Sequence, residues 1–230
     1  MTKVRYTQVI PVCLVVLLGA TLLVGTGCRT GYYAVMEKFG KHKRDLLRQS
    51  LTDASEQQRE VEQQFKDALT RLQELTGASG GELEERYQSF TKEYEKSRTQ
   101  SEGVAAHIRE VEHVARDLFN EWETELEEIQ SSTLKQKSRS KLLETQARFE
   151  KMRLSLLKSE QAMEPVLIQM KDYVLYLKHN LNAQAIGSLK DETFRIEAEI
   201  TQLISEMNRS IEETEQFILI LENEAGTTDQ

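Results

Sequence analysis

Residues 83–129 read LEERYQSFTKEYEKSRTQSEGVAAHIREVEHVARDLFNEWETELEEI and decide the fold. Apolar and aromatic residues recur here at alternating intervals of four and three positions, interrupted only by Ser97 and Ser101. This average spacing of about 3.5 residues places them in one stripe along a helix, and the stripe leaves water only against another helix. The positions are Leu83, Tyr87, Phe90, Tyr94, Ser97, Ser101, Val104, Ile108, Val111, Ala115, Leu118, Trp122, Leu126 and Ile129. The sequence therefore predicts a long helix that packs against other helices.

The preceding segment carries a similar seam and ends in a glycine-rich break. Its buried positions are expected to be Leu47, Leu51, Ala54, Gln58, Val61, Phe65, Ala68, Leu72 and Leu75. Residues 77–81 read GASGG, which supplies the left-handed and extended conformations that a helix stop and a turn require. A first helix over about 32–76 and a second over about 82–130 follow from this pattern.

Two more helices are expected downstream. Ser131, Ser132 and Thr133 offer N-cap hydroxyls. Every seventh residue of the next segment is then apolar, at Leu142, Phe149, Leu156, Met163, Met170 and Leu177. Pro165 interrupts this segment and cannot donate a hydrogen bond to the carbonyl of Gln161; since the heptad keeps phase across it, we expect a kink rather than an end. Asn180 suits a left-handed helix end, and Asn182 suits the N-cap of a last helix.

These patterns predict an all-α protein, an elongated antiparallel four-helix bundle or coiled coil of long helices. The near absence of proline and of strand-type alternation agrees with this class. The expected helices span about 32–76, 82–130, 133–180 and 183–223 and form one domain over 28–224, followed by a frayed tail at 225–230. Short turns between them favour up-down-up-down packing.

The first 27 residues have the order of a lipoprotein signal peptide. Lys3 and Arg5 form a positive n-region, Val12 to Val24 form an apolar h-region, and small residues precede Cys28. This arrangement resembles the bacterial lipobox, in which cleavage leaves Cys28 as a lipid-carrying amino terminus. The alternative is an uncleaved anchor, because the apolar stretch from Val9 to Thr26 reaches about 18 residues, close to a membrane span.

Cleavage would leave an acidic chain with 28 basic and 38 acidic residues and with Cys28 as its single cysteine, consumed by acylation. The negative charge argues against nucleic acid as a partner. The residue after Cys28 is Arg29 rather than the aspartate that usually retains lipoproteins in the inner membrane. We therefore expect the periplasmic face of the outer membrane, with inner-membrane anchoring in the periplasm as the alternative.

Several motifs together resemble the domain-of-unknown-function family two-nine-five-nine, and they extend over nearly all of the chain after Cys28. They are Gly31-Tyr32-Tyr33, Glu37-Lys38-Phe39-Gly40-Lys41-His42-Lys43-Arg44, Gln64-Phe65-Lys66-Asp67-Ala68-Leu69, Val114-Ala115-Arg116-Asp117-Leu118-Phe119-Asn120-Glu121-Trp122-Glu123, Glu164-Pro165-Val166-Leu167 and Leu177-Lys178-His179-Asn180-Leu181-Asn182-Ala183. Tyr173 departs from the family pattern, which is polar there. The resemblance implies a small exported lipoprotein of Gram-negative bacteria with coiled-coil character, and it brings no catalytic residues.

No residue pattern indicates an enzyme, and we expect no catalytic residue, metal ligand or cofactor. A di-iron carboxylate site in a helical bundle needs two Glu-x-x-His motifs, whereas this chain has one, Glu110 with His113. Phosphate-binding loops and zinc-type Cys/His spacings do not occur. A Ser-His-Asp arrangement stays open, although long polar-faced helices offer few concave sites.

Two groups of residues are candidates for interaction. The basic residues Lys41, Lys43 and Arg44 could hold anionic headgroups or an anionic envelope polymer, although an ordinary solvated face explains them as well. A tip at the turn between the last two helices contains Lys178, His179, Asn180 and Asn182, where helix capping is the competing interpretation. Trp122 is expected in the core rather than in a partner interface.

Taken together, the sequence favours a non-enzymatic cell-envelope protein that is anchored by lipid on Cys28. We expect it to act as a scaffold or adaptor through contacts of helix faces with an envelope protein. The alternative is a metal- or ligand-binding enzyme or sensor within a periplasmic bundle. Narrow seams could also pair between chains, so a homo-oligomer stays open.

Overall fold

A computed structural model describes residues 28–78, 80–188 and 190–226, with side chains over 43–78, 81–182, 184–187 and 192–223. The chain divides into two compact units, Met1–His42 and Lys43–Gln230. The second unit contains the predicted seams and is the one discussed below.

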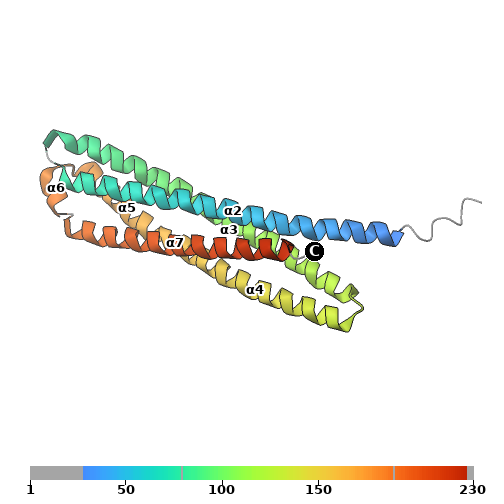
Figure 1. The fold of residues 1–230 in the computed structure, drawn as a ribbon. Coiled ribbons are helices and arrows are strands. Elements are labelled where there is room, and N and C mark those ends of the chain that lie inside the picture. Colours follow the sequence, from blue (N-terminus) through green and yellow to red (C-terminus); the bar gives the residue numbers. More distant parts are fainter. Residues whose placement is uncertain (1–27, 79, 189, 227–230) are drawn as a thin grey trace, which may run out of the picture. The chain divides into compact units, whose positions relative to one another are not determined.

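The described residues are almost entirely helical, and none of them lies in a β-strand. Their elements are α2 (Cys28–Gly77), the 3-10 turn η1 (Gly80–Glu82), α3 (Leu83–Glu128), α4 (Ser132–Gln161), α5 (Met163–His179), α6 (Ala183–Ser188) and α7 (Lys190–Gly226) (Figure 1). The prediction of an all-α helical bundle is therefore confirmed.

Polar contacts show which helices of the second unit are neighbours. Between α2 and α3, the amide of Gln64 donates to the carboxylate of Glu93 at 2.8 Å, and Arg86 lies 3.3 Å from Glu74. Between α4 and α7, Lys158 lies 2.7 Å from Glu206. Residue numbers that rise along α2 fall along α3, so these two neighbours run in opposite directions (Figure 1).

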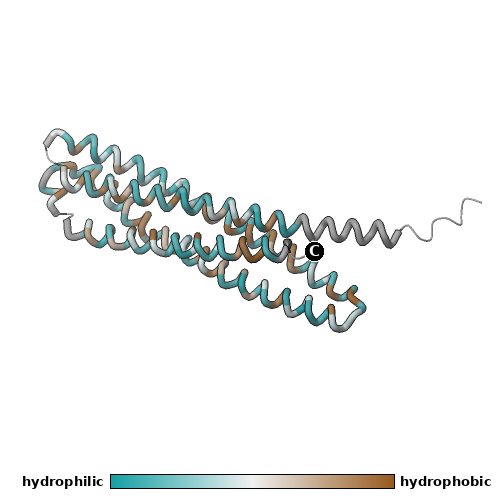
Figure 2. Tube along the Cα trace, viewed as in Figure 1, coloured by the Kyte–Doolittle hydropathy of each residue, from teal (hydrophilic) through white to brown (hydrophobic). Residues whose placement is uncertain are grey.

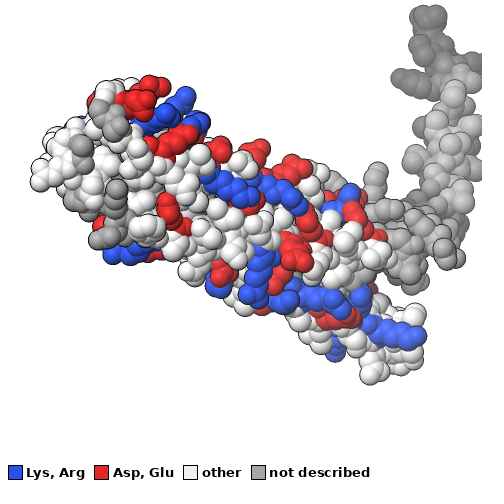
Figure 3. Space-filling view, turned by 60° about the vertical axis from the view of Figure 1, so that its left-hand side comes forward, with Lys and Arg blue, Asp and Glu red and all other residues white. Residues whose placement is uncertain are grey.

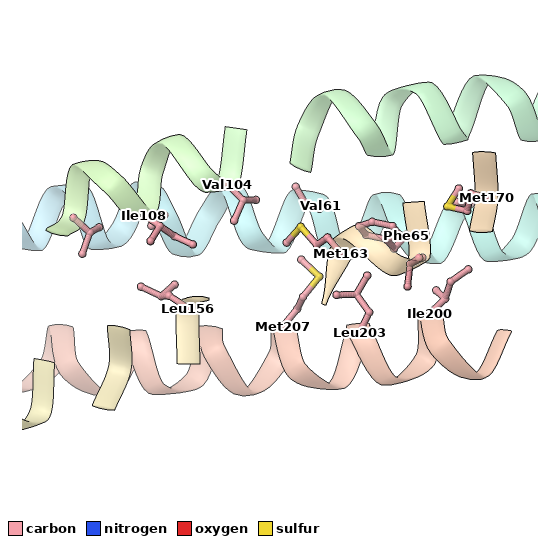
Figure 4. Close-up of a cluster of buried hydrophobic side chains, with 14 of the residues drawn as sticks. Val61, Phe65, Val104, Ile108, Leu156, Met163, Met170, Ile200, Leu203 and Met207 are labelled. Atoms are coloured by element: carbon pink, nitrogen blue, oxygen red, sulfur yellow. The ribbon is translucent and has the colours of Figure 1, made fainter. Parts of the chain in front are cut away.

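The predicted seams form the core. All nine expected positions of the first seam are buried, and the seam of α3 is buried at Leu83, Phe90, Tyr94, Ser97, Val104, Ile108, Val111, Ala115, Leu118 and Leu126. Figure 4 shows Val61 and Phe65 of α2 close to Met163 of α5 and Leu203 and Met207 of α7. The hydrophobic positions recur along helices that are otherwise largely hydrophilic, as amphipathic packing requires (Figure 2).

The helix expected over 133–180 is two helices, α4 and α5, with the interruption at Ala162. Pro165 has no N–H for the carbonyl of Gln161, and the regular helix ends at that residue. Ala162 keeps right-handed dihedrals (φ −71°, ψ −13°), and Leu156, Met163, Met170 and Leu177 are all buried. The continuous phase of the heptad is thus confirmed, although the single unbroken helix is not.

The turns follow the predicted caps with one exception. Ser131 Oγ accepts a hydrogen bond from the backbone N–H of Leu134 at 3.4 Å, and Asn182 Oδ1 accepts one from Ala185 at 2.9 Å. Asn180 was expected in a left-handed conformation, but its φ of −131° excludes this. Its side-chain amide donates instead to the carbonyl of Tyr176 at 3.0 Å. The helix expected over 183–223 is also divided, into α6 and α7.

The predicted signal peptide at 1–27 and the side chain of Cys28 lie outside the described residues, as do the tail residues 227–230. Among the helices that the structure does describe, none has both the length and the apolar character of a membrane span.

Candidate functional site

Two of the three basic residues proposed as an interaction site, Lys43 and Arg44, contact other residues of the second unit. Lys43 Nζ lies 3.1 Å from the carboxylate of Glu121 and donates to the carbonyl of Asp117 at 3.4 Å. The guanidinium of Arg44 lies over the ring of Trp122, 5.1 Å from its centroid. Both cations therefore hold α2 against α3 in addition to any role toward a ligand. The side chain of Lys41 lies outside the described residues.

Trp122 lies at the edge of the core rather than within it. Its side chain is partly buried, packs against the buried cluster, and donates its indole N–H to Ser138 Oγ at 2.9 Å. The expectation of a core tryptophan is corrected to this extent: the apolar ring is covered on one side by the bundle and on another by Arg44. An indole needs a partner for its N–H, which favours such an edge position.

Opposite charges meet where α3 ends and α4 begins. Glu127 lies 2.8 Å from Lys135 and 3.0 Å from Arg139. These pairs are exposed, so each contributes only about 0–1 kcal/mol. Figure 3 shows that acidic and basic side chains are interspersed over the visible face of the unit.

Glu125 is the titratable group with a distinct environment in this region. Burial, followed by the neighbouring carboxylate of Glu121, raises the pKa of Glu125, while Arg44 acts in the other direction. Glu127 shows the opposite behaviour, because the hydrogen bond and the charge of Lys135 lower its pKa. The two carboxyl groups therefore respond differently to pH.

Replacing Glu125 by glutamine should raise the melting temperature by about 1–3 °C at pH 7. A carboxyl group with a raised pKa in the folded state costs stability when it is ionised, and glutamine removes that cost. The gain should disappear as the pH falls below the ordinary carboxyl pKa of 4.5, because Glu125 is then neutral in both folded and unfolded chains. Thermal unfolding at pH 7 and pH 4 measures both effects.

Glu127→Gln is the matched control, since it makes the same chemical change at the end of the same helix. The pKa of Glu127 is lowered, so its ionised form stabilises the fold at pH values above the ordinary carboxyl pKa. This contribution is lost as the pH falls through the lowered pKa of the folded state. The control should therefore lower the melting temperature at pH 7. Equal shifts in both variants would contradict this description of the two environments.

A groove of about 530 Å³ lies between α3 and α4. Phe119 and Phe149 line it and meet edge to face, with ring centroids 5.5 Å apart. Arg153, also in its wall, lies 2.7 Å from Glu150 and 2.8 Å from Glu112. The hydrogen bonds of these two carboxylates raise the pKa of Arg153. The charge of Arg153 is therefore neutralised by carboxylates of its own chain. The groove contains this ion-pair network next to the rings of Phe119 and Phe149.

The predicted tip residues divide into two kinds. Lys178 and His179 are exposed at the end of α5. The helix dipole favours basic residues at this C-terminal position. Asn180 and Asn182 are used in capping, as described above. The tip thus exposes a lysine and a histidine, and its asparagines belong to the turn.

Glu110 and His113, the single Glu-x-x-His motif, are exposed on α3. His113 Nδ1 lies 2.8 Å from Arg116, and its other ring nitrogen lies 3.6 Å from Asp117. Within the described part of the chain, three or more His, Cys, Asp or Glu side chains do not gather at any point where a metal ion could be held.

The outer face of α4 and α5 was not singled out from the sequence. Nine large hydrophobic side chains are exposed among the described residues, and six of them belong to these two helices. They are Leu134, Leu143, Leu154, Ile168, Leu175 and Tyr176. Leu154, Ile168 and Leu175 share the seven-residue spacing of the buried row, and this spacing is the signal that could have identified them.

A search of curated proteins found no similar sequence. The model of a family described as "Protein of unknown function (DUF2959)" matches residues 32–221, which is most of the chain. This is the family that the motifs around Trp122, Pro165 and Asn180 indicate. The chain belongs to this family of proteins of unknown function.

Proposed function

We propose that this protein is a non-enzymatic, lipid-anchored protein of the cell envelope that acts as a scaffold or adaptor through helix-face contacts. The observation that supports this most is the concentration of exposed apolar side chains on α4 and α5. Scattered apolar residues are common on protein surfaces, but Leu154, Ile168 and Leu175 lie in one row along α4 and α5. Apolar residues gathered on one face are typical of a surface that binds another protein.

The anchor in this proposal is lipid on Cys28. The charged n-region, the short apolar h-region and the small residues before Cys28 support it. Arg29 at the following position supports the periplasmic face of the outer membrane as the address.

Cys28→Ala should abolish incorporation of radiolabelled palmitate, because the alanine side chain offers no sulfur for acylation. Cys13→Ala is the control, since it removes the other cysteine of the chain from within the apolar leader and should leave labelling unchanged. Gel analysis of labelled cells measures both. A Cys28→Ala chain that is labelled and processed like the parent chain would show that the lipoprotein assignment is wrong.

The contact surface can be tested in living cells with a photocrosslinking amino acid at Leu175, which is 49 % exposed on α5. Ala106, exposed on α3, is the control position. We expect discrete crosslinked protein species from position 175 and none from position 106. Similar crosslinking from both positions, or none from either, would contradict a specific role for the α4–α5 face.

A further inference from the structure

Three of the six exposed large apolar residues of α4 and α5 lie in one row, here called the outer row. It consists of Ala147, Leu154, Gln161, Ile168 and Leu175, each seven positions from the next. All five are exposed, with Leu154 at 54 % and Ile168 at 52 %. Residues seven positions apart lie along one line of a helix, which is the spacing of one core position of a coiled coil.

The outer row and the buried seam lie on opposite sides of the same helices. Leu156, Met163, Met170 and Leu177 each follow an outer-row residue by two positions, which is about 200° around a helix. These four are at most 2 % exposed. The bundle therefore occupies one side of α4 and α5, and the second apolar side is open in the described part of the chain.

We propose that a second copy of this chain covers the outer row, with the two copies antiparallel and related by a two-fold axis beside Gln161. In this pairing Leu154 lies opposite Ile168 of the second copy, and Ala147 lies opposite Leu175 of the second copy. Gln161 meets its own counterpart at the centre, where a polar pair can fix the register. This pairing rests on the proposed function, in which the α4–α5 face binds another protein. Here the bound protein is a second copy of the chain.

The charges beside the outer row support this arrangement. Glu150 lies eleven positions before Gln161 and Lys171 lies ten positions after it, so the two approach each other between copies. Lys151 and Asp172 form the corresponding pair on the other side of the row, and Glu144 faces His179 in the same way. All three pairs combine an acidic with a basic residue, and the two-fold axis repeats each pair.

These side chains are accessible for such contacts. Lys171, Asp172 and His179 are exposed, and none of them forms an ion pair with a described residue. Glu150 and Lys151 have partners on their own chain, Arg153 and Glu213, but remain 50 % and 72 % exposed. In a parallel copy in register, Lys171 would instead lie near Asp172 of the second copy, and Glu150 would lie near its Lys151. Only the antiparallel copy brings Glu150 and Lys171 together, so exchanging the charges of these two residues distinguishes the two arrangements.

Sedimentation equilibrium of the full chain in mild detergent tests this proposal. The unaltered chain should form a dimer, and Ile168→Glu should weaken dimerisation at least about tenfold because it places a carboxylate in both halves of the row. Lys171→Glu should also weaken it, since acidic residues then face Glu150. Adding Glu150→Lys to Lys171→Glu should restore dimerisation. Lys92→Glu is the control, because it makes the same change on the exposed face of α3.

A chain that stays monomeric at every concentration would overturn the proposal, and so would a dimer that Ile168→Glu and Lys171→Glu leave unchanged. Neither result affects the palmitate experiment. If position 175 crosslinks in cells only to a different protein, the proposed scaffold function is supported, whereas the proposed pairing of two copies is contradicted. All substituted side chains are exposed, and a thermal melt of each variant checks that the fold is retained.

Discussion

Replacing Phe65 by alanine should lower the free energy of unfolding by about 3–5 kcal/mol. Phe65 is fully buried where α2 meets α5 and α7, close to Met163 and Leu203 (Figure 4). The substitution removes an aromatic side chain from a closely packed interior and leaves a cavity that the surrounding helices fill only in part. In a chain of this size, thermal unfolding should record a decrease of about 10 °C in the melting temperature.

Phe194→Ala provides a control with the same chemical change. Phe194 is 72 % exposed on α7, so its replacement should change the free energy of unfolding by less than about 0.5 kcal/mol. Comparable losses in the two variants would mean that the buried faces of α2, α5 and α7 are assigned incorrectly.

The second large effect concerns a polar pair in the core. Gln58 of α2 is fully buried, and its amide nitrogen donates to Ser159 Oγ of α4 at 2.6 Å. Among the described residues, Gln58 Oε1 has no hydrogen-bond partner. A buried oxygen without a partner costs about 1–3 kcal/mol. Gln58→Met keeps the volume and removes this cost, so it should raise the free energy of unfolding by about 1 kcal/mol.

Ser159→Ala should have the opposite effect and cost about 1–3 kcal/mol, because it leaves the buried amide nitrogen of Gln58 unpaired as well. In the Gln58→Met background the same change should cost less, because the hydroxyl then bonds only to the carbonyl of Leu156. Denaturant titrations of the two single variants and the double variant form a thermodynamic cycle. If Gln58→Met destabilises the protein as much as Ser159→Ala does, the conclusion that Gln58 Oε1 is buried without a hydrogen-bond partner is wrong.

The buried faces could be predicted from the sequence because their physical cause is local. A residue such as Phe90 or Leu72 belongs to a stripe whose spacing matches the helix, and burial of that stripe is the main stabilising contribution. The caps at Ser131 and Asn182 could be predicted for the same reason, since each acts within four residues. The position of Trp122 could not, because its partial burial depends on Arg44 and Ser138, which come from other helices.

The outer row shows a second limit of sequence reasoning. Leu154 and Leu156 both belong to rows with seven-residue spacing, and periodicity alone does not tell whether the second row, that of Leu154, is also covered by the bundle. The structure resolves this point, because Leu156 is buried against the neighbouring helices whereas Leu154 is exposed. The break at Ala162 depended on geometry as well. A proline inside a helix can produce a kink or an end, and the outcome depends on the packing around it.

The pairing of two copies through α4 and α5 is tested most directly by disulfide formation at the two-fold axis. Gln161→Cys places a thiol where the two copies meet, so mild oxidation of membranes from growing cells should yield a covalent dimer. Ala106→Cys carries an equally exposed thiol on α3, and the unaltered chain gives the background of Cys13 and Cys28. We predict a dimer band with Gln161→Cys well above both references. A Gln161→Cys band no stronger than that of Ala106→Cys would contradict the account.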